Sequence, residues 1–172
     1  MKALIKTPRL LMRKFCLEDV DAVFEFSSNA DVTLYTGDAD SVKTRNDALK
    51  IITDIWLPEY KKYGYGRYAL VHRESGLVIG FCGLKYIPEH ERADLGYRML
   101  PEYWGQGLGF EAAAAALEYG RRTLGLKSIF AEADADNVAS NRILERIGLK
   151  LTRQHDEYGF KANFFEDVEN TA

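Results

Sequence analysis

A glycine-rich segment in the second half of the chain limits most narrowly how the chain can fold. Residues 103–112 place Gly105, Gly107 and Gly109 at alternate positions, between the apolar run 94–100 and an alanine-rich stretch. This order predicts a strand, a tight glycine loop and the start of a helix. The first N–H groups of a helix lack partners and lie at its positive end, so we expect a phosphate-bearing ligand to bind the loop.

Two common phosphate-binding motifs do not fit this loop. A P-loop ends in Gly-Lys-Ser or Gly-Lys-Thr, whereas Gly109 is followed by Phe110 and Glu111. A dinucleotide fingerprint has the spacing G-x-G-x-x-G inside a parallel βαβ unit. The spacing here is G-x-G-x-G, and the predicted elements around it form no such unit. The remaining structural alternative is a glycine-rich turn before an ordinary helix.

A second polar segment follows another strand-like run. Residues 136–149 come shortly after the run 128–133 and contain an Asn-x-x-Ser-Asn pattern at Asn137, Ser140 and Asn141. Together with the glycine loop, this segment resembles the GNAT superfamily of acyl-CoA-dependent N-acyltransferases. The loop is similar to the pyrophosphate-binding motif of that family, and the Asn-x-x-Ser-Asn pattern is similar to its later motif. The order and spacing of the two motifs make the resemblance specific.

Within that superfamily the chain is most similar to the RimJ/RimL-like branch. There Trp precedes the first glycine of the loop and Glu-Ala follows the last, as Trp104 and Glu111-Ala112 do here. The branch also opens with a T-x-R-L-x-L-R strand, which corresponds to residues 7–13. The resemblance extends over nearly the whole chain, from residue 7 to residue 168. It implies a single-domain α/β fold of the α+β kind, with a largely antiparallel mixed sheet and a splayed strand pair that binds acyl-CoA.

Hydrophobic periodicity predicts the element order β-α-α-β-β-β-α-β-α-β-β, which is also the order that the resemblance implies. The second helix is expected to begin after Ser41, a favourable N-cap, and to end or bend at Pro58. The resemblance implies that the strands ending near Leu100 and Asp134 splay apart. The predicted strands are 9–13, 67–73, 77–85, 94–100, 128–134, 150–158 and 160–168, and the predicted helices are 17–26, 42–56, 110–124 and one at Ser140.

Composition limits the kinds of partner and compartment. The 172 residues suit one domain, which we expect to span residues 1–168 as a single N-acetyltransferase domain, with 169–172 as a disordered tail. No stretch approaches the ~20 apolar residues of a membrane span, and a net charge of −3 argues against nucleic acid, so we expect neither partner. Two cysteines are too few for a disulfide framework, which favours a cytoplasmic location. The scattered His72, His90 and His155 predict no metal site.

The resemblance implies acetyl-CoA as the acyl donor. We expect the backbone N–H groups of the glycine loop to hold its pyrophosphate, and the end of the preceding strand to bind the pantetheine and polarise the thioester carbonyl. Asn137 and Asn141 are expected to bind the pantetheine, with turn and cap chemistry as the alternative. The expected cofactor-binding residues are Met99, Leu100, Trp104, Gly105, Gln106, Gly107, Leu108, Gly109, Phe110, Asn137, Ser140 and Asn141.

Removal of a proton from an attacking amine calls for a carboxylate near the thioester. Asp94 occupies the position of an acidic residue often found on this strand in the family, and its alternative role is that of a solvated acid at a strand start. The facing strand and the last hairpin offer further candidates, and the sequence leaves the choice among them open. These candidates are Glu132, Asp134, Asp136, Asp156 and Glu157.

Protonation of the leaving thiolate calls for an acidic hydrogen near the sulfur. Several GNAT enzymes use a tyrosine seven residues after the motif asparagine, a position that Leu144 occupies here. Ser140 is therefore the expected proton donor, as in the RimL-like enzymes that the chain resembles. Helix capping is the alternative role for this serine.

We therefore predict an N-acetyltransferase that moves an acetyl group from acetyl-CoA to a primary amine by direct attack in a ternary complex. The resemblance favours a protein or peptide α-amino group or a small amine, and we expect the loop at residues 35–38 to select among them. The acidic Asp38 and Asp40, together with Asp156 and Glu157, would attract a cationic acceptor, with ordinary solvated loop charges as the alternative. A non-catalytic acyl-CoA-binding sensor and transfer to a hydroxyl are the alternatives, and a homodimer is left open.

Overall fold

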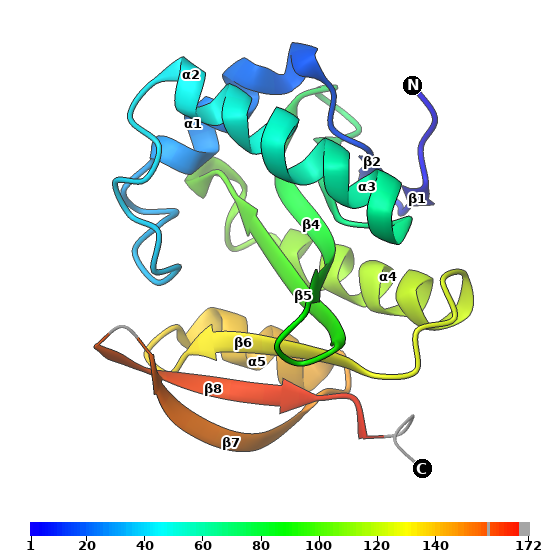
Figure 1. The fold of residues 1–172 in the computed structure, drawn as a ribbon, viewed down its shortest axis with the longest axis vertical. Coiled ribbons are helices and arrows are strands. Elements are labelled where there is room, and N and C mark those ends of the chain that lie inside the picture. Colours follow the sequence, from blue (N-terminus) through cyan, green and yellow to red (C-terminus); the bar gives the residue numbers. More distant parts are fainter. Residues whose placement is uncertain (158, 169–172) are drawn as a thin grey trace.

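Hairpins and short connections join most successive strands, and such connections produce antiparallel pairing. The computed structural model describes residues 1–157 and 159–168, so the predicted tail at 169–172 lies outside the described residues. Eight strands form one sheet in the order β1-β2-β3-β4-β5-β6-β8-β7, in which the β5–β6 pair is parallel and the others are antiparallel (Figure 1). The strands are β1 (Ile5–Lys6), β2 (Leu10–Arg13), β3 (Arg67–His72), β4 (Val78–Ile87), β5 (Arg92–Met99), β6 (Ile129–Asp134), β7 (Lys150–Glu157) and β8 (Phe160–Glu166).

Helices cover both faces of the sheet. Neighbouring residues of a strand point to opposite faces, so a single strand contacts helices on both sides. On β4, Phe81 contacts Phe26 of α1 with ring centroids 6.1 Å apart, whereas Leu84 lies under Gly120 of α4. Among residues 1–157 and 159–168, no helix is long and apolar enough to cross a membrane. The helices are α1 (Val20–Ser28), α2 (Arg45–Lys50), α3 (Leu57–Tyr63), α4 (Leu108–Arg122) and α5 (Val138–Arg146), with the 3₁₀ turns η1 (Leu17–Asp19) and η3 (Pro101–Tyr103) and the π-helical η2 (Ile51–Trp56).

The second predicted helix begins later and continues further than the sequence pattern indicated. Thr44, not Ser41, is its N-cap: the Thr44 side chain accepts a hydrogen bond from the Asp47 N–H, and the Asp47 carboxylate accepts one from the Thr44 N–H. The helical path then runs through η2 into α3 and ends at Gly64, beyond Pro58. Pro58 is tolerated because it stands in the first turn of α3, directly after a π-helical turn in which the regular bonding pattern is already interrupted.

The parallel pair β5–β6 separates soon after it forms. Its register places only Ala93 opposite Ile129 and Asp94 opposite Phe130. Beyond this point β5 stays paired with β4, and β6 stays paired with β8. The sheet therefore divides into two wings, β1–β5 and β6–β8, with a gap between the later residues of β5 and β6. The predicted mixed α/β fold and its splayed strand pair are confirmed, as is the element order apart from the short β1 and the subdivided second helix.

A face of small residues lets α4 lie close to the place where the two wings meet. A Cβ atom on Gly120 would lie 2.5 Å from Leu84 Cδ1 and 2.9 Å from Ile129 Cδ1. Since Leu84 belongs to β4 and Ile129 to the short parallel pairing, α4 braces the sheet at the start of the gap. The other buried small residues on this face are Ala112, Ala113 and Ala116.

We expect Gly120→Val to lower the free energy of unfolding by about 1–3 kcal/mol, because its methyl groups overpack the contact with Leu84 and Ile129. Urea unfolding followed by circular dichroism measures this change. The control is Ala114→Val, at a half-buried position on the same helix, where only the difference in helix propensity of below ~1 kcal/mol should appear. Equal losses in the two variants would contradict a close approach at Gly120.

Candidate functional site

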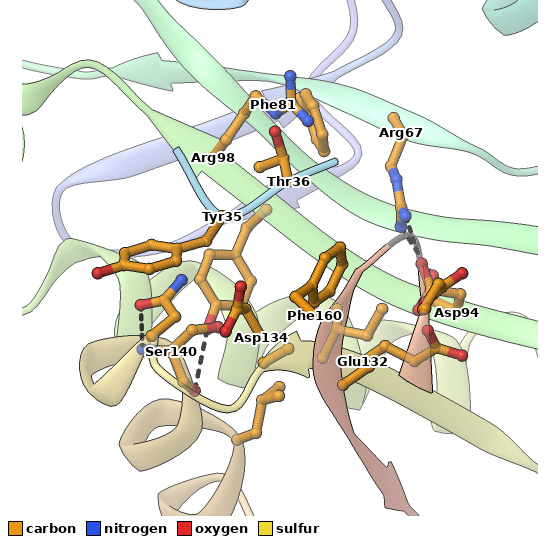
Figure 2. Close-up of a pocket in the computed structure, with 18 residues that line it drawn as sticks. Tyr35, Thr36, Arg67, Phe81, Asp94, Arg98, Glu132, Asp134, Ser140 and Phe160 are labelled. Atoms are coloured by element: carbon orange, nitrogen blue, oxygen red, sulfur yellow. Dashed lines mark hydrogen bonds and ion pairs between the residues drawn. The ribbon is translucent and has the colours of Figure 1, made fainter. Parts of the chain in front are cut away.

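A cavity of about 220 Å³ opens in the gap between the two wings. Its walls come from β5, β6, β8, the start of α5 and the loop that carries Tyr35 and Thr36 (Figure 2). The predicted site residues Asp94, Asn137 and Ser140 all line it, so residues from both parts of the resemblance meet in one place. The glycine loop follows β5 directly through η3, and it therefore begins where this gap ends.

Contacts with the start of the chain hold the glycine loop in position. The Arg9 guanidinium donates to the Gln106 carbonyl at 2.7 Å and to the Glu111 carboxylate at 2.9 Å. The same carboxylate accepts from the Thr7 hydroxyl and from the Arg9 N–H. Burial raises the pKa of Glu111, but these hydrogen bonds outweigh it and hold the pKa below its ordinary value. The T-x-R segment near the start of the chain therefore binds the glutamate that follows the glycine loop.

The backbone conformation of the loop depends on glycine. Gly105 has φ 74° and Gly107, the N-cap of α4, has φ 80°, a region that side-chain-bearing residues rarely adopt. The indole N–H of Trp104 donates to the Met99 carbonyl at 2.8 Å and ties the loop to the end of β5. The first N–H groups of α4 have no intrahelical acceptor. They belong to Leu108, Gly109 and Phe110.

The edge of β5 that faces β6 presents main-chain groups to the gap. The Leu100 N–H donates to the Ile79 carbonyl at 2.8 Å, so this residue, an expected pantetheine partner, is bonded to β4 instead. Because hydrogen bonds alternate along an antiparallel pair, the N–H groups of Leu95, Tyr97 and Met99 point away from β4 and toward β6. The parallel pairing has ended there, and these groups face the gap.

The start of α5 assigns different roles to the three polar residues of the later motif. Asn137 is the N-cap, and its side chain accepts a hydrogen bond from the Ser140 N–H at 3.2 Å. Ser140 therefore lies inside the helix and is not a cap. The Asn141 amide donates to the carbonyls of Asp134 and Asn137 and accepts from Asn163, so it holds the β6–α5 turn against β8. Asn137 lines the cavity as well as capping the helix.

Tyr97 is a site residue that the sequence analysis missed. It extends from β5 across the gap, and its hydroxyl lies 2.9 Å from the Ser140 Oγ on α5. Burial raises the pKa of Tyr97 above its ordinary value, so the phenol stays protonated. Leu144, which stands where some relatives have a tyrosine, also lines the cavity. The alternation of side chains along β5 predicts which face of the sheet Tyr97 lies on. Only the tertiary fold shows that Ser140 of α5 lies opposite that side chain.

Only 18% of the Asp94 side chain is exposed and its carboxylate is paired with Arg67, which argues against its alternative role as a solvated acid. The Arg67 guanidinium donates to the Asp94 carboxylate at 2.5 Å (Figure 2). It also donates to the carbonyls of Gly83 and Asp94 at 2.7 Å. Burial raises the pKa of Asp94, and the charge of Arg67 opposes this shift. Gly96 leaves the room for this pair, because a Cβ there would lie 2.5 Å from Arg67 Nη2.

Two carboxylates and an imidazole lie together on the other wing. Burial, together with hydrogen bonding and charge repulsion from Glu157, raises the pKa of Glu132 to about 7. The His155 Nε2 lies 3.8 Å from Glu132 and 3.5 Å from Glu157. The donor atoms of these three residues lie within 4.8 Å of one another and could hold a cation, a grouping that the scattered histidines did not predict. Of the other predicted acids, Asp134 lines the cavity, whereas Asp136 and Asp156 are exposed.

The loop expected to select the acceptor does reach the cavity. Tyr35 and Thr36 line it, and the Thr36 hydroxyl donates to the Asp38 carboxylate. Asp38 in turn lies 3.1 Å from the Arg98 guanidinium of β5. Its charge is thus balanced by an arginine, which weakens the expected attraction of a cation, while Asp40 is exposed and lies outside the cavity lining.

Known proteins share both the sequence pattern and this fold. The chain matches the family model described as the acetyltransferase (GNAT) domain over residues 9–150. The uncharacterized N-acetyltransferase YoaA of Bacillus subtilis (strain 168) is 32% identical over 151 residues, which cover 87% of this chain and 84% of YoaA. The crystal structure of a GNAT-family acetyltransferase from Bacillus anthracis is 26% identical, with a TM-score of 0.79, and the match covers 95% of this chain and 96% of that one.

A more distant structure has an equally close fold. RimL, a ribosomal L7/L12 alpha-N-protein acetyltransferase solved in complex with coenzyme A, is 17% identical with a TM-score of 0.84, over 96% of this chain and 97% of RimL. The sequence match, the relatives and the splayed sheet agree with one another. The chain belongs to the GNAT family and is an acetyl-CoA-dependent acetyltransferase.

Proposed function

We propose that this enzyme transfers the acetyl group of acetyl-CoA directly to a primary amine that is bound in the cavity between the wings. The observation that carries the proposal is the arrangement of Ser140 and the Glu132–Glu157 pair around one cavity, next to unpaired main-chain groups of β5. A thioester in this gap has a hydroxyl on one side and a carboxylate base on the other (Figure 2). These are the groups that acyl transfer to an amine requires.

The glycine loop and β5 bind acetyl-CoA in this proposal. The pyrophosphate lies against the N–H groups of residues 105–110, where the positive end of α4 favours an anion. The pantetheine runs along the gap and bonds to the main chain of Tyr97 and Met99 in place of the missing strand. An N–H group of β5 then polarises the thioester carbonyl, as an oxyanion hole does.

Glu132 is the proposed general base, in preference to Asp94. A base is most effective when its pKa is near the working pH, and the pKa of Glu132 is about 7. The Asp94 carboxylate is bound by Arg67, so taking up a proton would weaken a buried ion pair. Asp94 and Glu157 place negative charge near Glu132 and help to raise its pKa. Asp94 is therefore proposed as a positioning residue of the base.

Ser140 is the proposed proton donor to the leaving thiolate. Its hydroxyl proton moves to the coenzyme A sulfur as the C–S bond breaks, and a proton from solvent restores the hydroxyl. The hydrogen bond with Tyr97 orients the hydroxyl. Transfer is direct, because neither Cys16 nor Cys82 lines the cavity and neither offers a thiol that could carry the acetyl group. The amine nitrogen attacks the carbonyl carbon, and the products are an amide and coenzyme A.

Acetyl-CoA consumption with a panel of primary amines tests this function. Mass spectrometry of the products should show addition of an acetyl group through an amide bond that resists mild hydroxylamine. A hydroxylamine-labile ester would establish transfer to a hydroxyl. Coenzyme A binding without turnover on any acceptor would establish a non-catalytic sensor. A parallel arm with a chelator reports whether a cation at Glu132, His155 and Glu157 takes part.

We expect Gly107→Ala to weaken coenzyme A binding at least about tenfold, because a residue with a side chain strains the N-cap at φ 80° and displaces the N–H groups that face the pyrophosphate. Isothermal titration with coenzyme A measures the loss. Gly76→Ala is the matched control, since Gly76 has φ 72°, no atom within 4 Å of an added Cβ, and a place in the remote β3–β4 turn. Similar affinities in both variants would remove the loop from the cofactor site.

We expect kcat/KM to fall below about pH 7 in the wild type, because a general base acts only when it is deprotonated and the pKa of Glu132 is about 7. Glu157→Gln removes the neighbouring negative charge, so the pKa of Glu132 falls and the acid limb of the profile moves to lower pH. Asp156→Asn, on the same strand but exposed, is the control and should leave the limb in place. Glu132→Gln should lower kcat by about 10²–10⁴-fold. An acid limb indifferent to Glu157→Gln would contradict this assignment.

We expect Ser140→Ala to lower kcat about tenfold or more with little change in acetyl-CoA affinity, the pattern of a group that acts in the transition state. Tyr97→Phe should lower kcat by a smaller factor, since it removes only the partner of the hydroxyl. Steady-state kinetics with acetyl-CoA titration measures both. Ser28→Ala, which removes a hydroxyl on α1 bonded to the Phe24 carbonyl, is the control. A lower melting temperature with unchanged kcat would reduce Ser140 to a structural role.

A further inference from the structure

Two arginines line the cavity, and they are held in different ways. Arg67 is bound to two strands through main-chain carbonyls and the Asp94 carboxylate. Arg98 has its carboxylate partner on a surface loop: Asp38 lies 3.1 Å away, with 43% of its side chain exposed against 13% for Arg98. A mostly buried cation is therefore balanced by an anion that water can reach, and such exposed pairs are weak.

The Arg98 guanidinium also has donor capacity that the described residues leave unused. Its Nε–H is buried and lacks a hydrogen-bond partner within residues 1–157 and 159–168. The guanidinium lies over the Phe81 ring, 5.0 Å from the centroid, which fixes the orientation of its plane. Asp38 accepts a hydrogen bond from Nη2 alone, so a carboxylate that replaced Asp38 could bind Nη2 and the neighbouring Nε–H through two parallel hydrogen bonds.

The opposite end of the cavity carries the opposite charge. In Figure 2, Arg98 and Phe81 lie beside the Tyr35–Thr36 loop, whereas Glu132 lies at the far end. Glu157 lies beside Glu132 there, whereas Asp134 lines the cavity nearer Ser140 (Figure 2). A cavity of about 220 Å³ has room for a molecule of amino-acid size, with its amine toward the acids and an anionic group toward Arg98.

We propose that the acceptor is a small amino carboxylate, whose amine binds at the Glu132–Glu157 end and whose carboxylate replaces Asp38 on Arg98. This inference rests on the proposed N-acetyltransferase function and names its substrate class. Displacement of Asp38 releases the loop at residues 35–38 to water, where an exposed carboxylate is stable without a partner. A polyamine offers no anion to Arg98, and an internal peptide bond offers only a neutral carbonyl.

The test uses unbranched amino acids from glycine to 6-aminohexanoate, each beside its primary amide, which keeps the amine and removes the negative charge. The measured quantity is the ratio of kcat/KM for the acid to kcat/KM for the amide. For the wild type we expect a ratio above one, largest at the chain length that spans the cavity. Arg98→Gln should lower this ratio about 10- to 100-fold, the effect of losing a charge-assisted hydrogen bond. Arg98→Lys, which keeps the charge without the fork, should restore part of it.

Asp38→Asn supplies the decisive comparison, because it breaks the same ion pair from the other side. If Asp38 competes with the substrate carboxylate, its removal should raise the acid-to-amide ratio roughly twofold to fivefold. If the Arg98–Asp38 pair only fastened the loop, Arg98→Gln and Asp38→Asn would change the acid-to-amide ratio in the same direction. Arg92→Gln is the matched control, since Arg92 stands on the same strand, pairs with Glu166 and lies outside the cavity lining. The acid-to-amide ratio of this variant should equal that of the wild type.

The outcomes separate this inference from the function on which it rests. Acids and amides acetylated equally well, with a ratio indifferent to Arg98→Gln, would overturn the inference and leave the N-acetyltransferase intact. Changes of the same sign in Arg98→Gln and Asp38→Asn would also overturn it. Acetylation of polyamines or peptides, with none of any amino acid, would assign the cavity to another acceptor class. A wild type that acetylates no amine would refute the proposed function itself.

Discussion

The short pairing of β5 with β6 is the constraint on which the rest of the structure depends. Strand pairing joins the wings at two pairs of residues, and beyond them the facing edges of both strands are left without a partner strand. Unpaired main-chain groups next to a cavity are costly unless a ligand or water satisfies them. The antiparallel ladders on the outer sides, β4 with β5 and β6 with β8, keep each wing rigid while the inner edges stay open. The gap is thus a binding site built from the backbone, and its position requires little of any one side chain.

Side chains then decide what happens in the gap, and charge is distributed unevenly over its walls. On the β5 wing, two arginines balance Asp94 and Asp38. On the other wing, Glu132 and Glu157 lie together beside His155, with a raised pKa at Glu132. The Arg67–Asp94 pair serves position, because a buried ion pair that loses one partner is strongly destabilised. The unbalanced pair serves chemistry, because only a carboxylate that can gain and lose a proton near neutral pH acts as a base.

The features that the sequence predicts well are those set by local residues. The glycine loop and the start of α4 follow from three alternate glycines between a strand and an alanine-rich helix, and the φ angles of Gly105 and Gly107 explain why glycine is needed. The prediction of Ser41 as the N-cap of α2 was wrong, although Thr44 and Asp47 have the spacing of a capping box that Ser41 lacks. The continuation past Pro58 could not be predicted, because a π-helical turn depends on packing around it.

The features that the sequence could not predict are contacts between distant segments. The sequence shows Glu111 only as the glutamate that follows the glycine loop, but Arg9 and Thr7, about a hundred residues earlier, bind its carboxylate. Tyr97 and Ser140 are 43 residues apart, and their hydroxyls meet because the gap brings α5 opposite β5. Asp94 was recognisable from the family resemblance, yet its burial beside Arg67 was not. Periodicity gives the face on which a residue lies, whereas the chemistry of that residue depends on what the fold places opposite.

A crystal structure with bound coenzyme A tests the central claim most directly, which is that the opened edge of β5 takes the cofactor as a substitute strand. We expect the pantetheine between β5 and β6, with hydrogen bonds to the main chain of Tyr97 and Met99. The pyrophosphate should lie against residues 105–110, and the sulfur should lie within hydrogen-bonding distance of the Ser140 Oγ. A cofactor bound outside the gap, with β5 and β6 still separated and their main-chain groups bonded to water alone, would contradict this mechanism.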